Sequence, residues 1–174
     1  TIERAFVFDR DTQAAECFAR EMSERLAIEV VAMSAHECLR EVDIICTATP
    51  STEPLFDPED IPPGTHINAV GSYKLTMHEI PEQIVARAKV VVDQIDACLA
   101  ETADLILPIR YGLFSREKVH AELGRLVLGE IPGRTDPDEI TLFKSVGLAI
   151  QDLAAATAVL QAAETEGVGT VVEL

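Results

Sequence analysis

The sequence predicts a doubly wound α/β fold with an open, mainly parallel sheet. Short apolar runs of strand length alternate with segments whose apolar residues recur at helical spacing. Proline, glycine and acidic residues punctuate the boundaries between these segments. Such alternation favours a parallel sheet that helices cover on both faces. No repeat, linker or low-complexity tract divides the 174 residues, so we expect one domain over 1–174.

Apolar runs in the first hundred residues predict five strands, at 4–8, 28–32, 42–48, 66–70 and 89–93. Helices are expected between them, at 14–26, at 36–40 after a capping Ser34, at 81–88 after Pro81, and at 94–103. In an open parallel sheet the carboxyl ends of such strands meet along one edge.

The last third has a different pattern. A helix that Ser115 caps is expected there, because apolar residues follow at helical spacing, namely Val119, Leu123, Leu126 and Val127. A loop then leads into further elements, which we expect to be a strand at 139–143, a long alanine-rich helix at 146–163 and a terminal strand at 168–174.

The composition excludes several classes of protein. A formal net charge of −16, with no cluster of lysines or arginines, argues against nucleic acid or an anionic membrane surface as a partner. No apolar run reaches membrane-spanning length, and residues 1–4 lack the features of a signal peptide, so we expect a cytoplasmic protein. The chain begins with Thr1 and not with methionine, which is a first hint of a segment upstream.

Cysteines and histidines show no metal-ligand spacing. The cysteines form no CxxC pair, and the histidines form neither HxxxH nor HExxH, so we expect no metal site. The cysteines fall in apolar stretches. We therefore interpret all four as buried free thiols, namely Cys17, Cys38, Cys46 and Cys98.

An acid follows the first predicted strand. In a dinucleotide-binding sheet, a carboxylate at such a strand end binds the adenosine ribose, about 20 residues after a glycine-rich turn. Asp9 has this position, but no glycine precedes Gly64, so the GxGxxG turn is missing. Capping of the following helix, to which Asp11 is equally suited, would also explain an acid here.

Three further strand ends carry small or hydroxyl side chains. Segments 47–51 (TATPS) and 68–73 (NAVGSY) end the third and fourth strands, where open α/β sheets bind cofactors, although ordinary turns would explain both. Lys144 and Ser145 follow the strand at 139–143, at the mouth of the last helix, whose free N–H groups favour negative charge. Helix capping by Ser145 is the alternative.

Taken in order, six segments resemble the ornithine cyclodeaminase and mu-crystallin family, which also includes alanine dehydrogenases and cyclic ketimine reductases. They are DR at 9–10, TATPS at 47–51, HINAVGSY at 66–73, VVD at 91–93, GEIPGR at 129–134 and EITLFKSVGLAIQD at 139–152. The stretch TLFKSVG after PGR is the most specific, and the resemblance runs over nearly the whole chain.

This resemblance implies a Rossmann-type domain that holds NAD or NADP, in a homodimeric enzyme that interconverts an amino acid and its imine by hydride transfer. It places Asp9 and Arg10 at the adenosine ribose. It draws the other cofactor contacts from the later strand ends, namely Thr47, Ala48, Thr49, Val70, Gly71, Ser72, Ser145 and Gly147. Asp9 favours NAD, because a carboxylate binds a free 2′-hydroxyl, whereas Arg10 could pair with the 2′-phosphate of NADP.

The chain departs from the family pattern at three places. The glycine-rich loop and the N-terminal part, which supplies substrate-binding residues and dimer contacts, have no counterpart, so we expect residues 146–174 to return toward a segment outside this chain. Tyr73 stands where ornithine cyclodeaminases carry a catalytic aspartate, and it is our candidate for proton handling. Residues 75–78 replace the usual proline, glycine and lysine before the acid that Glu79 matches.

The expected function is therefore an NAD(P)-dependent oxidoreductase or deaminase that acts on a small amino acid, keto acid or cyclic imine. Tyr73 makes a reductase or dehydrogenase easier to support than cyclodeamination of ornithine. Two alternatives stay open. One is a non-enzymatic dinucleotide or small-ligand binding protein of the mu-crystallin type, and the other is an inactive truncated relative.

Overall fold

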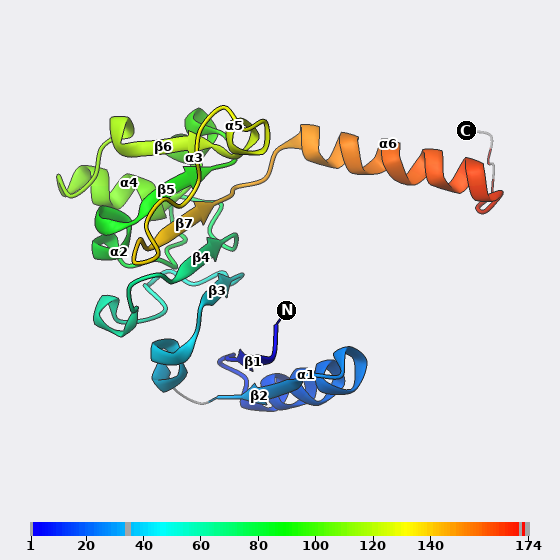
Figure 1. Ribbon diagram of the computed structural model, residues 1–174, viewed down its shortest axis with the longest axis horizontal. Helices are drawn as coiled ribbons and strands as arrows, with labels where there is room; N and C mark the ends of the chain where they lie inside the picture. The colour runs from blue at the N-terminus through cyan, green and yellow to red at the C-terminus, as the bar shows by residue number, and fades with distance from the viewer. Residues whose placement is uncertain (1, 34–35, 171, 173–174) are drawn as a thin grey trace.

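The computed structural model describes residues 2–33, 36–170 and 172, and within them seven strands form two parallel sheets (Figure 1). The strands are β1 (Arg4–Val7), β2 (Glu29–Ala32), β3 (Ile44–Thr47), β4 (His66–Ala69), β5 (Lys89–Val92), β6 (Val119–Glu122) and β7 (Thr141–Lys144). One sheet pairs β1 with β2, and the other has the order β3-β4-β7-β5-β6. The six strands that we predicted up to residue 144 are confirmed.

The helices between the strands differ widely in length. They are α1 (Thr12–Leu26), α2 (Glu82–Arg87), α3 (Ile95–Glu101), α4 (Ala103–Arg110), α5 (Leu123–Val127) and α6 (Ala149–Glu166), with the 3-10 helices η1 (His36–Glu41), η2 (Pro58–Asp60) and η3 (Arg116–Lys118). Helix α1 begins after Asp11, whose carboxylate accepts the N–H groups of Gln13 and Ala14 at 3.0 and 3.1 Å. The predicted cap Ser34 lies outside the described residues.

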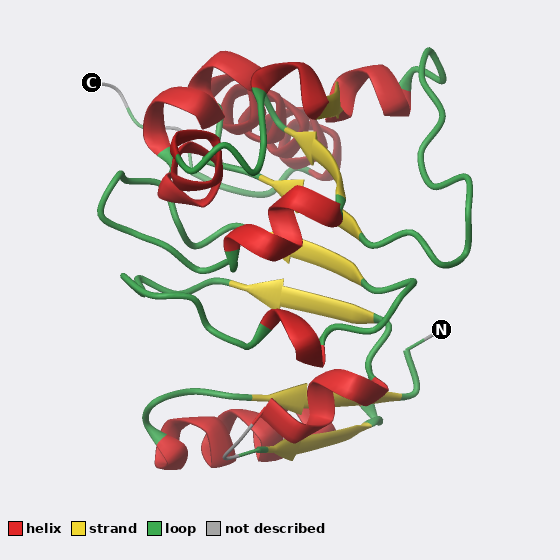
Figure 2. Cartoon of the chain, turned by 90° about the vertical axis from the view of Figure 1, so that its left-hand side faces the viewer, coloured by secondary structure: helices red, strands yellow, loops and turns green. Residues whose placement is uncertain are grey.

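The chain reverses its direction of travel between the two sheets. From β1 it steps outward to β2, then returns past β1 to β3 and continues the opposite way to β4. In both views β1 lies between β2 and β3, and Figure 2 shows the strands of the two sheets pointing the same way. Among the described residues no strand pairs with the edge of β1 that faces β3. The predicted doubly wound parallel fold, without a glycine-loop strand in this chain, is confirmed.

One face of the five-stranded sheet holds the core. Alternate residues of β4, β7 and β5 point to this face, and Ile67, Leu142 and Val90 are almost completely buried on it. Ile84 of α2 and Leu105 of α4 pack against them and are fully buried. Each such aliphatic side chain contributes about 1.5–3 kcal/mol by leaving water, so these helices fix the position of the sheet.

The opposite face of the same sheet is only partly covered by the described residues. Ile44 is 53% exposed, although helices on both faces were predicted. Part of this face stays open because α6 extends away from the sheet after β7 (Figure 1) and buries none of its residues. No helix among the described residues is both long and apolar enough to cross a bilayer.

Two predicted elements near the carboxyl terminus differ from the structure. The helix expected after Ser115 is instead η3, β6 and α5, because residues 119–122 pair with the edge of β5 and bury Ala121. The terminal strand is absent at residues 168–170 and 172, which follow a helix end at Gly167 and have no strand beside them, and the rest of 168–174 lies outside the described residues.

The cysteines follow the prediction only in part. All four are free thiols, as expected. Only Cys98 is buried, whereas Cys17 and Cys46 are exposed and Cys38 is half-buried. The difference arises because α1 is exposed along much of its length and Cys46 lies on the open face of the sheet, so an apolar stretch does not ensure burial at these positions.

A short salt bridge organises the loop that enters β7. Lys89 Nζ lies 2.7 Å from Glu139 Oε2, and the same carboxylate accepts the backbone N–H of Thr135 at 3.0 Å. The hydrogen bond from Lys89, reinforced by the one from Thr135, lowers the pKa of Glu139 from 4.5 to about 2. Glu139 thus ties the loop to the start of β5.

This salt bridge predicts a specific loss of stability in acid. A depressed carboxylate pKa contributes stability above its unfolded value, and that stability is lost as the pH falls toward the folded value. We expect the free energy of unfolding to fall more steeply between pH 4.5 and pH 2 in the wild-type protein than in Glu139→Gln. Urea unfolding at a series of pH values measures this, and parallel curves for the two proteins would contradict it.

Candidate functional site

The strand ends of the larger sheet form a straight row. The parallel register pairs Thr47 with Ala69, Ala69 with Lys144, and Lys144 with Val92. The ladder continues one step further, because the N–H of Ser145 donates to the carbonyl of Ala69 at 3.1 Å. The loops after these strands therefore begin side by side. We call residues 47–49, 70–72, 93 and 145–147 the carboxyl edge.

The loop after β1, which begins with residues 8–10, leaves the strand on the same side of the molecule as the loops after the other strands (Figure 2). Asp9 and Arg10 are exposed, and Asp9 Oδ1 accepts the N–H of Asp11 at 2.8 Å, which holds the carboxylate at the strand end. The change of direction between β1 and β3 is where open α/β sheets bind ligands. The carboxyl end of β1 thus lies on the side of the carboxyl edge, and Asp11 takes the role of helix cap.

A buried carboxylate joins the loops after β3 and β4. Both oxygens of Glu79 are used. Its Oε1 accepts the N–H of Thr49 at 2.6 Å and the hydroxyl of Thr49 at 2.9 Å. Its Oε2 accepts the N–H groups of Gly71 and Ser72 at 2.9 and 3.0 Å and the hydroxyl of Thr47 at 3.1 Å. Glu79 is fully buried, so the carboxylate bonds to protein groups and not to solvent.

A second carboxylate organises the loop after β7. Asp93 Oδ2 accepts the hydroxyl of Ser145 at 2.8 Å and the N–H groups of Val146 and Gly147 at 2.9 Å each. Burial alone would raise the pKa of Asp93, but hydrogen bonds from the Cys98 thiol, the Ser145 hydroxyl and two backbone N–H groups outweigh it and lower that pKa. Ser145 consequently holds this loop and does not cap α6, whose N-cap residue Leu148 offers no side-chain bond.

The Cys98 thiol lies against the same carboxylate. Its Sγ is 3.0 Å from Asp93 Oδ1. Burial, together with the bond to Asp93 and the charge of Asp93, raises the pKa of Cys98 to about 12. The thiol therefore acts as a buried donor and not as a nucleophile.

Lys144 does not reach the mouth of α6 as predicted. Its side chain turns into the core, where Nζ lies 3.0 Å from Asp104 Oδ2, and both residues are fully buried. The alternation of β7 explains the difference, because Lys144 shares the inward face with Leu142. Asp104 Oδ1 in turn accepts the N–H groups of Glu79 and Ile80 at 2.7 and 3.1 Å.

The outer surface of the carboxyl edge is small and largely apolar. Ala48, Val70 and Gly147 are exposed, and Thr49, Gly71 and Ser145 are half-buried. Thr47 and Ser72 are buried, with hydroxyls bonded inside the protein. Tyr73 is 47% exposed next to this edge, with Lys74 Nζ 5.0 Å from the centre of its ring. An extended ligand could therefore approach the main chain closely, beside one phenol.

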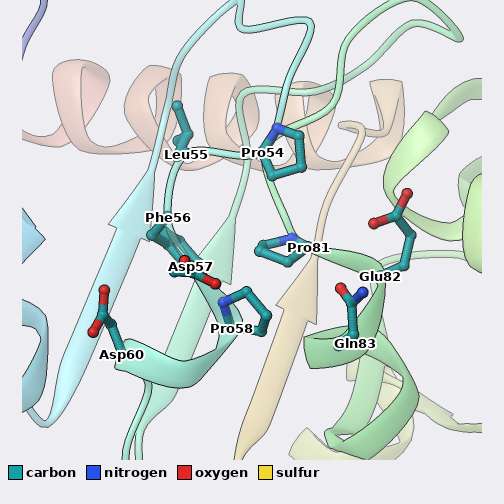
Figure 3. A pocket seen from close by; sticks show the side chains of 9 residues that line it. All are labelled: Pro54, Leu55, Phe56, Asp57, Pro58, Asp60, Pro81, Glu82 and Gln83. Atoms are coloured by element: carbon teal, nitrogen blue, oxygen red, sulfur yellow. The ribbon is translucent and has the colours of Figure 1, made fainter.

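A shallow hollow lies elsewhere, between the loop after β3 and the start of α2 (Figure 3). Its lining combines prolines and apolar residues with three acids, Asp57, Asp60 and Glu82. Acids of this kind repel a phosphate group. Among the described residues no group of histidine, cysteine and acidic side chains could hold a metal ion.

Sequence reasoning missed the roles of the three buried acids. Glu79 and Asp93 were noted only as parts of motifs, and Asp104 was not singled out. A signal for Asp104 did exist, because Thr102 caps α4 by accepting the N–H of Asp104 at 3.2 Å, a pattern that marks a helix start. Nothing in the local sequence reveals that Asp104 contacts Glu79.

Comparison with known proteins identifies close relatives. The chain is 42% identical over 174 residues to a Delta(1)-pyrroline-2-carboxylate reductase of Bacillus cereus, covering 99% of this chain and 53% of that reductase. The chain spans about half the length of the curated relatives it matches.

Solved structures agree with this relationship. The reductase of the same kind from Thermococcus litoralis, in complex with NADH and L-proline, has a TM-score of 0.93 and 41% identity over 98% of this chain and 53% of that chain. An archaeal alanine dehydrogenase dimer with bound NAD has a TM-score of 0.90 and 33% identity over 99% of this chain and 53% of that chain.

A family model covers almost the whole chain as well. It matches residues 1–167, which include every strand and the whole of α6. The resemblance inferred from the six sequence segments is confirmed by this match. The chain belongs to the ornithine cyclodeaminase/mu-crystallin family.

Proposed function

We propose that this chain forms the cofactor-binding part of an NAD(P)-dependent oxidoreductase that interconverts a small amino acid and its imine. A five-membered cyclic imine carboxylate is the favoured substrate. The observation that carries the proposal is the row of strand ends at the carboxyl edge, in a chain 41% identical to a reductase whose structure contains NADH and L-proline. The presence of Tyr73 supports reduction over cyclodeamination.

The residues of the carboxyl edge suit a dinucleotide. Exposed Ala48 and Val70 leave the main chain accessible, and nothing lies within 4 Å of the position a Cβ would take at Gly147. Thr49 and Ser145 supply hydroxyls at half-buried positions, so they can contact a ligand and the protein at once. The chain has no glycine before Gly64 and thus no glycine-rich turn for the pyrophosphate. We therefore assign its own residues to the ribose and nicotinamide ends of the cofactor.

The nicotinamide supplies hydride when it is bound. The protein must then position the imine and handle one proton at its nitrogen. Tyr73 comes directly after Gly71 and Ser72 in the loop that follows β4, and its side chain is exposed. We assign Tyr73 to proton transfer at the substrate nitrogen, with the buried bonds of Ser72 holding the loop in place.

The first prediction concerns cofactor binding by the protein in its full encoded length. We expect saturable binding of NADH, weakened about 10-fold in Thr49→Val and in Ser145→Ala, because each change removes a hydroxyl at the edge. Thr165→Ala removes a hydroxyl from the exposed end of α6 and should bind as the wild type does. Fluorescence titration measures this. Wild-type affinity in both edge variants would remove Thr49 and Ser145 from the site.

The choice between NADH and NADPH tests the role of Asp9. A carboxylate at the ribose accepts a bond from the 2′-hydroxyl and repels a 2′-phosphate. We expect the wild type to prefer NADH, and Asp9→Ser to reduce the preference about 10-fold. Asp11→Ser is a matched control, since it removes the same charge but keeps a good helix cap. An unchanged preference in Asp9→Ser would place the ribose elsewhere.

Turnover tests the role of Tyr73. We expect Tyr73→Phe to lower kcat for reduction of a cyclic imine carboxylate by about 100-fold or more, while NADH affinity stays the same, because only proton transfer is lost. Tyr111→Phe, at an exposed tyrosine after α4, serves as the control. Equal kcat values would exclude Tyr73. NADH binding without turnover of any imine or amino acid tried would instead indicate a binding protein.

A further inference from the structure

We propose that Glu79 is the positioning residue of the cofactor site, acting through the backbone of the loops after β3 and β4. This inference rests on the proposed function in one respect, namely that those loops bind the dinucleotide. Glu79 itself is fully buried and so cannot touch a ligand. Its effect must pass through the groups bonded to it.

The bonding pattern of Glu79 differs from that of an ordinary buried acid. Five donors converge on it, which saturates the roughly four lone-pair sites of a carboxylate. Three of the five are backbone N–H groups, from two loops that lie more than twenty residues apart in the chain. A single side chain therefore sets the position of Thr49 relative to Gly71.

The loops after β3 and β4 also contact each other directly, and this contact restricts their relative position. A Cβ at Gly71 would overlap the backbone nitrogen and oxygen of Thr49, and would approach Glu79 Oε1 to 2.5 Å. Only glycine permits this contact. Gly71 and Glu79 thus work together, since the glycine allows the approach and the carboxylate supplies the attraction.

Hydrogen bonds to the main chain of Glu79 fix the position of this residue. Its own N–H donates to Asp104, and its carbonyl accepts the N–H of Leu55 at 2.9 Å. Asp104 is anchored by the buried Lys144, at the carboxyl end of the central strand β7. The position of Glu79 is therefore defined relative to the sheet, and not only relative to the two loops that it joins.

The test compares Glu79→Gln with Glu139→Gln in the protein in its full encoded length. Both variants replace a hydrogen-bonded carboxylate by an amide, but Glu139 lies before β7, at the opposite end of the strand from the carboxyl edge. In Glu79→Gln one acceptor oxygen becomes an NH₂ group that faces N–H donors. We expect NADH affinity to fall at least about 10-fold in Glu79→Gln and to stay unchanged in Glu139→Gln.

Amide hydrogen exchange provides a readout that needs no ligand. We expect exchange at Thr49, Gly71 and Ser72 to become at least about 10-fold faster in Glu79→Gln, while the core amides of β4 keep their relative rates. General destabilisation would accelerate both groups together. Wild-type NADH affinity in a folded Glu79→Gln protein, or unchanged exchange at these three amides, would overturn the proposal.

The two proposals fail in different ways. If the wild type binds neither NADH nor NADPH, the proposed function fails, and the exchange rates still decide whether Glu79 positions the loops. If Glu79→Gln does not fold, Thr47→Val takes its place, because it removes one buried donor to Glu79 with little change in volume. Unaltered exchange and unaltered NADH affinity in Thr47→Val would then contradict the proposal.

Discussion

The capture of backbone N–H groups by buried carboxylates is the interaction on which the rest of the structure depends. Where parallel strands end, the ladder stops supplying acceptors, and the next N–H groups need partners inside the protein. Glu79 meets this need for the loops after β3 and β4, and Asp93 meets it for the loop after β7. Asp104 does the same for the main chain of Glu79. Three acids thus turn flexible loop starts into a fixed edge.

Buried acids of this kind require charge compensation. An isolated carboxylate in a protein interior is strongly unfavourable, so each one must be bonded or paired. Glu79 and Asp93 are surrounded by N–H and hydroxyl donors, whereas Asp104 pairs with Lys144 at 3.0 Å. Removing one member of such a pair typically costs about 3–5 kcal/mol, because the other charge is left buried. The lysine at the end of β7 is therefore structural, although its place in the sequence suggested an anion site.

The sequence predicted the parallel fold well because the spacing of apolar residues and the position of turn residues are local signals. Strands β1 to β5 and β7 are short apolar runs, and those signals suffice for them. The strand β6 was not recognised, because its pairing with β5 is a tertiary contact that overrides a helical spacing. The same limit applies to the site. Its outer residues follow from strand ends, whereas the contact of Glu79 with Thr49 spans thirty residues and leaves no local trace.

The arrangement of these acids also bears on the proposed binding of an anionic dinucleotide by a chain with a net charge of −16. Asp93, within the carboxyl edge, and Glu79, which joins two of its loops, are both buried, and each accepts hydrogen bonds from several protein donors. What remains on the outside is main chain and small side chains, such as Ala48 and Gly147. More distant surface acids act weakly, because physiological salt screens exposed charges beyond about 8 Å. The oxygens of these two carboxylates thus face donors of the protein, whereas Asp9 stays exposed after β1.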